Sequence, residues 1–300
     1  MKKTLLSLAA GAICLCQSAT AEPVMVDITL QNDAQVRGYI LAADGKSIKY
    51  SVDKSGAGSS TVNMDQIKFL QLFAPDAWTE AENNYRLGEF EKAEEQFKAL
   101  AEEYAPIAAL EDEIGALSKY YYLKTLKANG KLEVLNDEID KMRAQPFALS
   151  SIYSEDAAWL VPWGLIGKSN WDGLLEFVAR YTDTEAQGDN PIPPFKKTVP
   201  RHKLAELSYF RAKAIEEKGQ PNDAIKDYYR AITLNRGADR QITKEAMLAL
   251  MNIIRNNENE SSSLANRSEL YTLTTFYQQA FGEGDLPSEY SGFLIPPPAE

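Results

Sequence analysis

The stretch NYRLGEFEKAEEQFKALAEEYAP, residues 84–106, has the pattern of a helical hairpin that turns at Gly88. After this glycine, apolar residues recur three or four positions apart at Phe90, Ala93 and Phe97, which is the spacing of one buried helix face. Glycine at the turn permits the left-handed backbone that ends many helices. Because one hairpin cannot bury its apolar face alone, the stretch predicts neighbouring copies.

Three further segments fit the same hairpin pattern. The clearest is AELSYFRAKAIEEKGQPNDAIKDYYRAITLN, residues 205–235. Two less regular copies are KYYYLKTLKANGKLEVLNDEI, residues 119–139, and AAWLVPWGLIGKSNWDGLLEFVARY, residues 157–181. The turn positions 88, 130, 169 and 219 are 42, 39 and 50 residues apart, and a serine replaces glycine at the third.

The two regular copies resemble the tetratricopeptide repeat (TPR) family. That family places small residues where two helices touch, a glycine at the turn and an aromatic residue on the second helix. Ala224 and Tyr228 of the later copy match Ala93 and Phe97 of the earlier one. The resemblance implies an α-helical solenoid, or α-α superhelix, over residues 75–281. The spacings here exceed the family's period of about 34 residues.

The longest spacing contains TDTEAQGDNPIPPFKKTVP, residues 182–200, which has four prolines and no helical period. We therefore expect a proline-rich linker inside the helical array. Two apolar helices are predicted beyond it, at residues 245–257 and 268–281, where they would extend or cap the array. The tail, residues 282–300, has no helical pattern and ends in PPPAE, so we expect it to be extended.

Before the helical part, residues 24–72 alternate with a period of two and predict about five short strands. Closing these strands would remove exposed sheet edges, so we expect a small β-barrel over residues 22–73. The runs LQNDAQVRGYILAADGKSIKYSVD and VNMDQIKFLQL resemble the Sm-like or SH3-like barrels. Many Sm barrels bind RNA, but this segment has no basic aromatic face, and a protein contact or spacer role is preferred. The fold class is thus β followed by α.

The first 21 residues, MKKTLLSLAAGAICLCQSATA, have the three-part pattern of a secretory signal peptide. We expect cleavage after Ala21 and a soluble periplasmic or secreted product. A lipoprotein signal would place a small residue before its cysteine, whereas Ile13 and Leu15 precede Cys14 and Cys16. No later apolar run approaches the ~20 residues of a membrane span.

Composition excludes several classes of partner and chemistry. Removal of Lys2 and Lys3 changes the formal net charge from −11 to −13, which disfavours nucleic acid and anionic lipid. Cleavage of the signal peptide removes both cysteines, so a cysteine nucleophile is excluded from the mature chain. His202, the only histidine, cannot form a zinc site alone. We predict no catalytic residue, metal or cofactor.

A candidate peptide-binding groove follows from the TPR resemblance. In that family the first helix of each pair lines a concave groove, notably through its fifth, ninth, twelfth and thirteenth positions. On that register the groove residues are Trp78, Glu82, Tyr85, Arg86, Tyr120, Lys124, Lys127, Trp159, Trp163, Tyr209 and Lys213. Rings and cations of this kind suit an extended peptide with carboxylates. A one-residue shift of register would instead make the aromatic residues ordinary core.

The preferred function is a non-catalytic scaffold or adaptor that binds other envelope or exported proteins through this groove. A second possibility is a structural protein that self-assembles through its β module. A third is an enzyme that acts on glycan or peptidoglycan through paired carboxylates.

Overall fold

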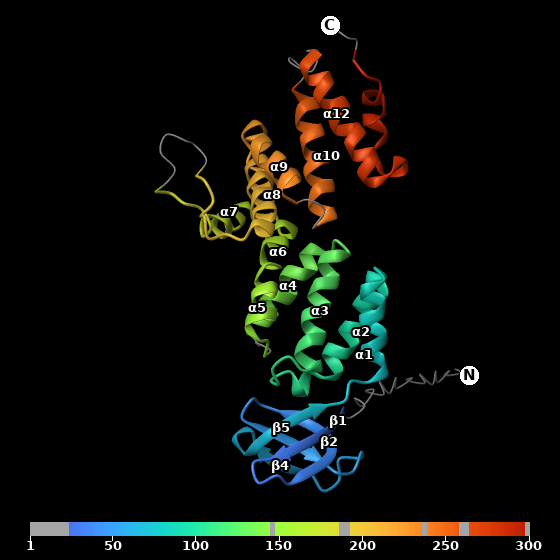
Figure 1. Cartoon of the computed structure of the whole chain (residues 1–300), viewed down its shortest axis with the longest axis vertical. Coiled ribbons are helices and arrows are strands. Elements are labelled where there is room, and N and C mark those ends of the chain that lie inside the picture. The colour runs from blue at the N-terminus through green and yellow to red at the C-terminus, as the bar shows by residue number, and fades with distance from the viewer. Residues whose placement is uncertain (1–23, 145–147, 186–192, 236–238, 258–263, 298–300) are drawn as a thin grey trace, which may run out of the picture. The chain divides into compact units, whose positions relative to one another are not determined.

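The computed structural model of the 300-residue chain describes residues 24–144, 148–185, 193–235, 239–257 and 264–297 (Figure 1). The expected signal peptide lies outside these residues. The chain divides into two compact units. The first comprises Met1–Lys131 and Glu138–Leu160, and the second comprises Leu132–Asp137 and Val161–Glu300.

The first unit begins with a five-stranded antiparallel sheet, so the strand prediction is confirmed. The strands are β1 (Val24–Leu30), β2 (Gln35–Ala43), β3 (Ser47–Ser51), β4 (Ser60–Asn63) and β5 (Ile67–Leu72). Their spatial order is β4-β3-β2-β1-β5. Alternate residues of β1, namely Val24, Val26 and Ile28, are buried, as the period of two requires.

The predicted closure of this sheet into a barrel is wrong, because the sheet is open. After β4 a single 3₁₀ turn, η1 (Met64–Gln66), brings the chain to β5, which pairs with β1. β4 has only four residues and pairs with β3. Among the described strands, β4 and β5 are therefore the two edges.

Helices complete the first unit (Figure 1). They are α1 (Asp76–Arg86), α2 (Phe90–Glu103), η2 (Ala105–Ile107), α3 (Ile114–Ala128) and α5 (Ser151–Ala158), while α4 (Leu132–Ala144) contributes residues to both units. α2 packs against α1 and α3, and η2 packs against β2 and α3. The buried side chains of Phe97, Leu123 and Leu126 form the centre of this helical core.

The second unit is helical throughout its described secondary structure, apart from one isolated β-bridge. Its elements are α6 (Val161–Gly167), α7 (Trp171–Ala179), α8 (Arg201–Glu217), α9 (Pro221–Asn235), α10 (Arg240–Asn256), α12 (Leu264–Phe281), η3 (Glu283–Asp285) and η4 (Ser288–Leu294). α8 packs against α7 and α9, α9 packs against α10, and α10 packs against α12. The tail expected to be extended contains η3 and η4 instead, and η4 packs against α12.

All four predicted turns have the same backbone geometry. The φ angles are +79° at Gly88, +69° at Gly130, +52° at Ser169 and +83° at Gly219. At the first turn, the amide of Gly88 donates to the carbonyl of Tyr85 (3.1 Å) and the amide of Glu89 donates to that of Asn84 (2.9 Å). The same two hydrogen bonds recur at the other three turns, which identifies four Schellman caps. The helical region is thus compatible with a repeat architecture.

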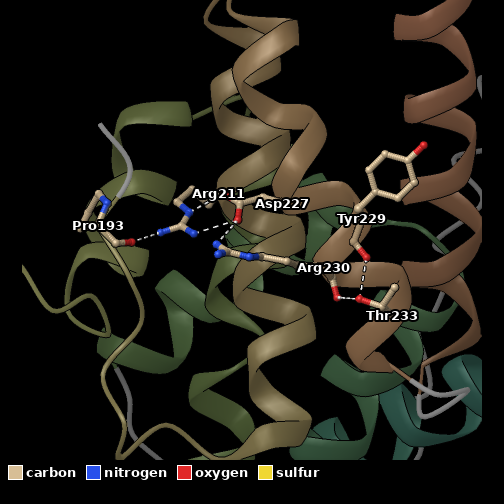
Figure 2. A network of polar contacts seen from close by, with 6 residues as sticks. All are labelled: Pro193, Arg211, Asp227, Tyr229, Arg230 and Thr233. Atoms are coloured by element: carbon tan, nitrogen blue, oxygen red, sulfur yellow. Dashed lines mark hydrogen bonds and ion pairs between the residues drawn. The ribbon is translucent and has the colours of Figure 1, made fainter. Parts of the chain in front are cut away.

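The two described ends of the proline-rich segment pair with each other, and one of them is hydrogen-bonded to α8. Thr182 and Phe195 form an antiparallel bridge, and the amide of Asp183 donates to the carbonyl of Pro194 (2.7 Å). The guanidinium of Arg211 on α8 donates to the carbonyl of Pro193 (2.7 Å), as Figure 2 shows. Residues 186–192 lie outside the described part.

Candidate peptide-binding site

The predicted groove residues divide between buried rings and a more exposed set. Five aromatic residues are buried, namely Trp78, Tyr120, Trp159, Trp163 and Tyr209. Their burial fits the core-packing alternative. Of the remaining residues, Arg86 is exposed. The others are half-buried, namely Glu82, Tyr85, Lys124, Lys127 and Lys213.

In the first unit, Glu82, Tyr85 and Arg86 lie near a ring that the groove register omitted, that of Tyr121. Its ring stacks on Phe97 with centroids 5.1 Å apart. It also makes edge contacts with Tyr120 at 5.1 Å, Tyr85 at 5.4 Å and Trp78 at 5.8 Å. Tyr121 itself is half-buried, whereas Tyr120 and Tyr122 on either side are buried. Successive residues on a helix point about 100° apart, so only one of three adjacent tyrosines lies at this rim.

Charged side chains lie beside these rings. The charges of Glu82 and Arg86 act on the Tyr121 hydroxyl, and that of Lys127 acts on the Tyr85 hydroxyl. The Arg86 guanidinium is 71% exposed and lies 3.7 Å from the Glu82 carboxylate, a loose pair that leaves its other donors directed at solvent. These side chains form one side of a surface that we name the aromatic–basic face.

A polar cluster forms the other side of the aromatic–basic face. The Lys124 ammonium lies 3.2 Å from the Asp156 carboxylate and 3.1 Å from the Tyr120 hydroxyl. The Tyr120 hydroxyl donates to Asp156, and the Tyr120 ring contacts that of Tyr153 at 5.2 Å. Burial raises the pKa of Tyr120, and its hydrogen bond to Asp156 raises it further because ionisation would place two negative charges together.

The aromatic–basic face therefore comprises Glu82, Tyr85, Arg86, Tyr121, Lys124, Lys127, Tyr153 and Asp156. Tyr121, Tyr153 and Asp156 were missed from the sequence. The run of three tyrosines signalled that one of them would lie at the rim, but not which one. No sequence signal points to Tyr153 or Asp156, because they come from α5, which the repeat pattern did not resolve as a helix of its own.

In the second unit, the predicted residues Tyr209 and Lys213 line a cavity of about 390 Å³. Tyr209 donates a hydrogen bond to Glu245, and Tyr228 donates one to Glu216. The Lys213 ammonium pairs with Glu217 at 2.7 Å. Trp163 lies stacked on the Tyr209 ring at 5.6 Å and belongs to the buried core.

The C-terminal segment forms one wall of this cavity through Pro287, Glu289 and Tyr290. Tyr290 is buried, and its ring lies under the guanidinium of Arg255 at 5.0 Å. Arg255 also pairs with Glu289 at 3.3 Å. The cavity thus combines tyrosine hydroxyls, three glutamates and a lysine, each in a polar contact within the chain.

The described ranges contain no group of three or more histidine, cysteine, aspartate or glutamate residues arranged to hold a metal ion. Within the same ranges, no helix is both long and apolar enough to cross a bilayer. No family model, characterised protein or solved structure matches the chain.

Proposed function

We propose that this protein is a non-catalytic adaptor of the cell envelope that binds an extended peptide segment of a partner protein on the aromatic–basic face. One observation carries the proposal: the half-exposed rings of Tyr85 and Tyr121 lie in contact, at 5.4 Å, beside the exposed guanidinium of Arg86. Tyrosine and arginine side chains are enriched in protein interfaces because they combine large contact area with directional donors.

The expected ligand follows from the same chemistry. Tyrosine rings offer flat apolar surface to an extended chain, and the guanidinium can hold a carboxylate through two parallel hydrogen bonds. Glu82 and Asp156 on the face would disfavour a peptide that carries several negative charges. A peptide with one carboxylate between apolar side chains therefore fits best.

Site-specific photo-crosslinking in cells tests the proposal. A photoreactive amino acid placed at Arg86 is expected to capture a partner, whereas one placed at Lys92 on α2, whose side chain is similarly exposed at 69%, is not. A peptide from the captured partner should then bind about 10-fold more weakly to Arg86→Glu than to Lys92→Glu, a loss of about 1.4 kcal/mol. Equal capture at both positions would contradict the proposal.

A second candidate function, self-assembly through the β module, is favoured by the open sheet. β5 is an edge strand, and its Phe69 side chain is 58% exposed. Unprotected edges of this kind pair with other strands. If the chain assembles in this way, Phe69→Lys should shift a multimer toward monomer in light scattering, while Val52→Lys, at a 69% exposed position after β3, should not.

A further inference from the structure

The cavity of the second unit is lined by more carboxylates than cations. It lies between α8, α9, α10 and the C-terminal segment that contains η4, and its volume is about 390 Å³. This volume is within the range of roughly 300–1,000 Å³ that small-molecule sites occupy. The charged residues of the lining are Lys213, Glu216, Glu245 and Glu289.

Two of these four charges are neutralised by ion pairs within the chain. The Lys213 ammonium lies 2.7 Å from the carboxylate of Glu217, which is outside the lining. The Glu289 carboxylate lies 3.3 Å from the guanidinium of Arg255. The remaining charge of the cavity is therefore that of its other two glutamates, one on α8 and one on α10.

These two glutamates have only neutral hydrogen-bond partners among the described residues. Glu216 accepts a hydrogen bond from the hydroxyl of Tyr228, and Glu245 accepts one from the hydroxyl of Tyr209 and one from the side-chain amide of Gln241 at 2.9 Å. Burial, followed by the charges of Glu245 and Glu216, raises the pKa of Tyr209. Both carboxylates thus lie near one hydroxyl, and a cation shared between them would offset their mutual repulsion.

The chemistry of the walls favours a guanidinium over other organic cations. A guanidinium has donors along more than one edge, so it can bond two carboxylates at once, whereas an ammonium is compact and strongly hydrated. Leu248 and Pro287 add apolar wall, which suits the weakly hydrated guanidinium and an attached alkyl chain. The chain shows the same recognition beside the cavity, where the Arg255 guanidinium lies between the Glu289 carboxylate and the Tyr290 ring, 5.0 Å from the ring centroid.

We propose that this cavity binds an alkylguanidinium group, which donates hydrogen bonds to the carboxylates of Glu216 and Glu245 while its alkyl chain packs on Leu248 and Pro287. The group can come from an arginine side chain of a bound peptide or from a free alkylguanidine, since both present the same cation. The site belongs to the second unit and does not depend on the aromatic–basic face of the first.

NMR titration of the full-length protein with butylguanidine and with butylamine tests the proposal, because the two ligands have the same charge and the same alkyl chain. The variants are Glu216→Gln and Glu245→Gln, in which the amide oxygen still accepts the tyrosine hydrogen bond. Asp172→Asn is the matched control, because it makes the same charge change at an 86% exposed carboxylate outside the cavity. Lys213→Gln removes the positive charge from the lining.

We expect butylguanidine to bind with a Kd of about 1 mM and butylamine to bind about 10-fold more weakly. Glu216→Gln and Glu245→Gln should each weaken butylguanidine binding about 10-fold, and Asp172→Asn should leave it unchanged. Lys213→Gln should tighten binding, because a cation in the cavity no longer meets a like charge.

Three results would overturn the proposal: equal affinity for the two ligands, unchanged binding in both glutamate variants, or no saturable binding below about 20 mM. If the glutamate variants unfold at lower urea than wild type, Lys213→Gln decides, and weaker binding in this variant would also overturn the proposal. The peptide acetyl-Gly-Arg-Gly-amide then distinguishes the two sources. Tighter binding than butylguanidine supports an arginine side chain of a partner, and weaker binding supports a free alkylguanidine.

Discussion

Ser169 is the residue at which this sequence departs most clearly from its own turn pattern. Its φ of +52° is in the left-handed region, where a side chain costs free energy that glycine does not incur. We therefore expect Ser169→Gly to stabilise the protein by about 0.5–1 kcal/mol, measured by urea unfolding.

Gly88→Ala provides the reciprocal control. A Cβ added at Gly88 meets nothing within 4 Å, so the cost of the change comes from the backbone at φ +79° alone. It should destabilise by about 1 kcal/mol. If Ser169→Gly lowers stability instead, the serine side chain has a stabilising contact that outweighs its backbone cost.

The Tyr122 hydroxyl makes the free energy of unfolding fall as pH rises in the alkaline range. Burial, followed by the negative charges of Glu138, Glu94 and Glu102, raises the pKa of Tyr122 from 10.0 to about 12. Between those pH values the unfolded chain has lost this proton while the folded chain keeps it, so the folded state binds more protons and stability falls as pH rises. The effect is absent below about pH 9, where both states are protonated.

We expect Tyr122→Phe to weaken this fall when urea unfolding is compared at pH 8 and pH 11. Other buried tyrosines with raised pKa values, among them Tyr209 and Tyr228, will keep part of the slope. Tyr50→Phe, in the sheet, is the matched control. An identical pH dependence in wild type and Tyr122→Phe would show that Tyr122 is accessible to ionisation in the folded protein.

The α8–α9 hairpin is held by a buried ion pair (Figure 2). The Arg211 guanidinium contacts both oxygens of the Asp227 carboxylate, at 2.6 and 2.8 Å, and both side chains are almost fully buried. Arg230 adds a third contact to the same carboxylate at 3.2 Å. Since Arg211 also holds the carbonyl of Pro193, the pair joins two helices and the proline-rich segment.

Removal of one partner of the buried ion pair should therefore lower the free energy of unfolding strongly. Asp227→Ala leaves the Arg211 charge buried without a counter-ion, and we expect a loss of about 3–5 kcal/mol in the free energy of unfolding. Asp172→Ala removes the 86% exposed partner of Lys218 and should change stability by less than about 1 kcal/mol. A small effect of Asp227→Ala would mean that water reaches the guanidinium.

The elements could be predicted where a short-range pattern determines them. The period of two located the five strands, and turn residues located four hairpins, because each depends on neighbours a few positions away. Closure of the sheet depends on whether β4 meets β5, which no local pattern encodes. The positions of the candidate groove residues depend on packing in the same way. Trp78 and Tyr120 are buried where α1, α2 and α3 pack together, and a register shift of one residue decides between core and groove.

At the scale of the whole molecule, the chain has two units, each with its own buried core. Phe97 and Leu123 are fully buried in the first unit, and Tyr228 and Leu250 are fully buried in the second. A unit with its own core can open as a separate cooperative unit. We therefore expect hydrogen exchange in the two units to respond separately to destabilising changes.

Phe97→Ala and Asp227→Ala test this separation, because each acts on one core. Phe97→Ala should lower the opening free energy of α2 and α3 by about 3–5 kcal/mol and leave α8 and α9 unchanged, and Asp227→Ala should do the reverse. Exchange measured by mass spectrometry at rising urea resolves both sets of helices in one sample. α4 contributes residues to both units. Hydrogen exchange in the peptides of α4 therefore shows whether this helix opens with the first unit or with the second. If either substitution lowers protection equally in both sets, the chain unfolds as one cooperative body, and the two cores depend on each other for stability.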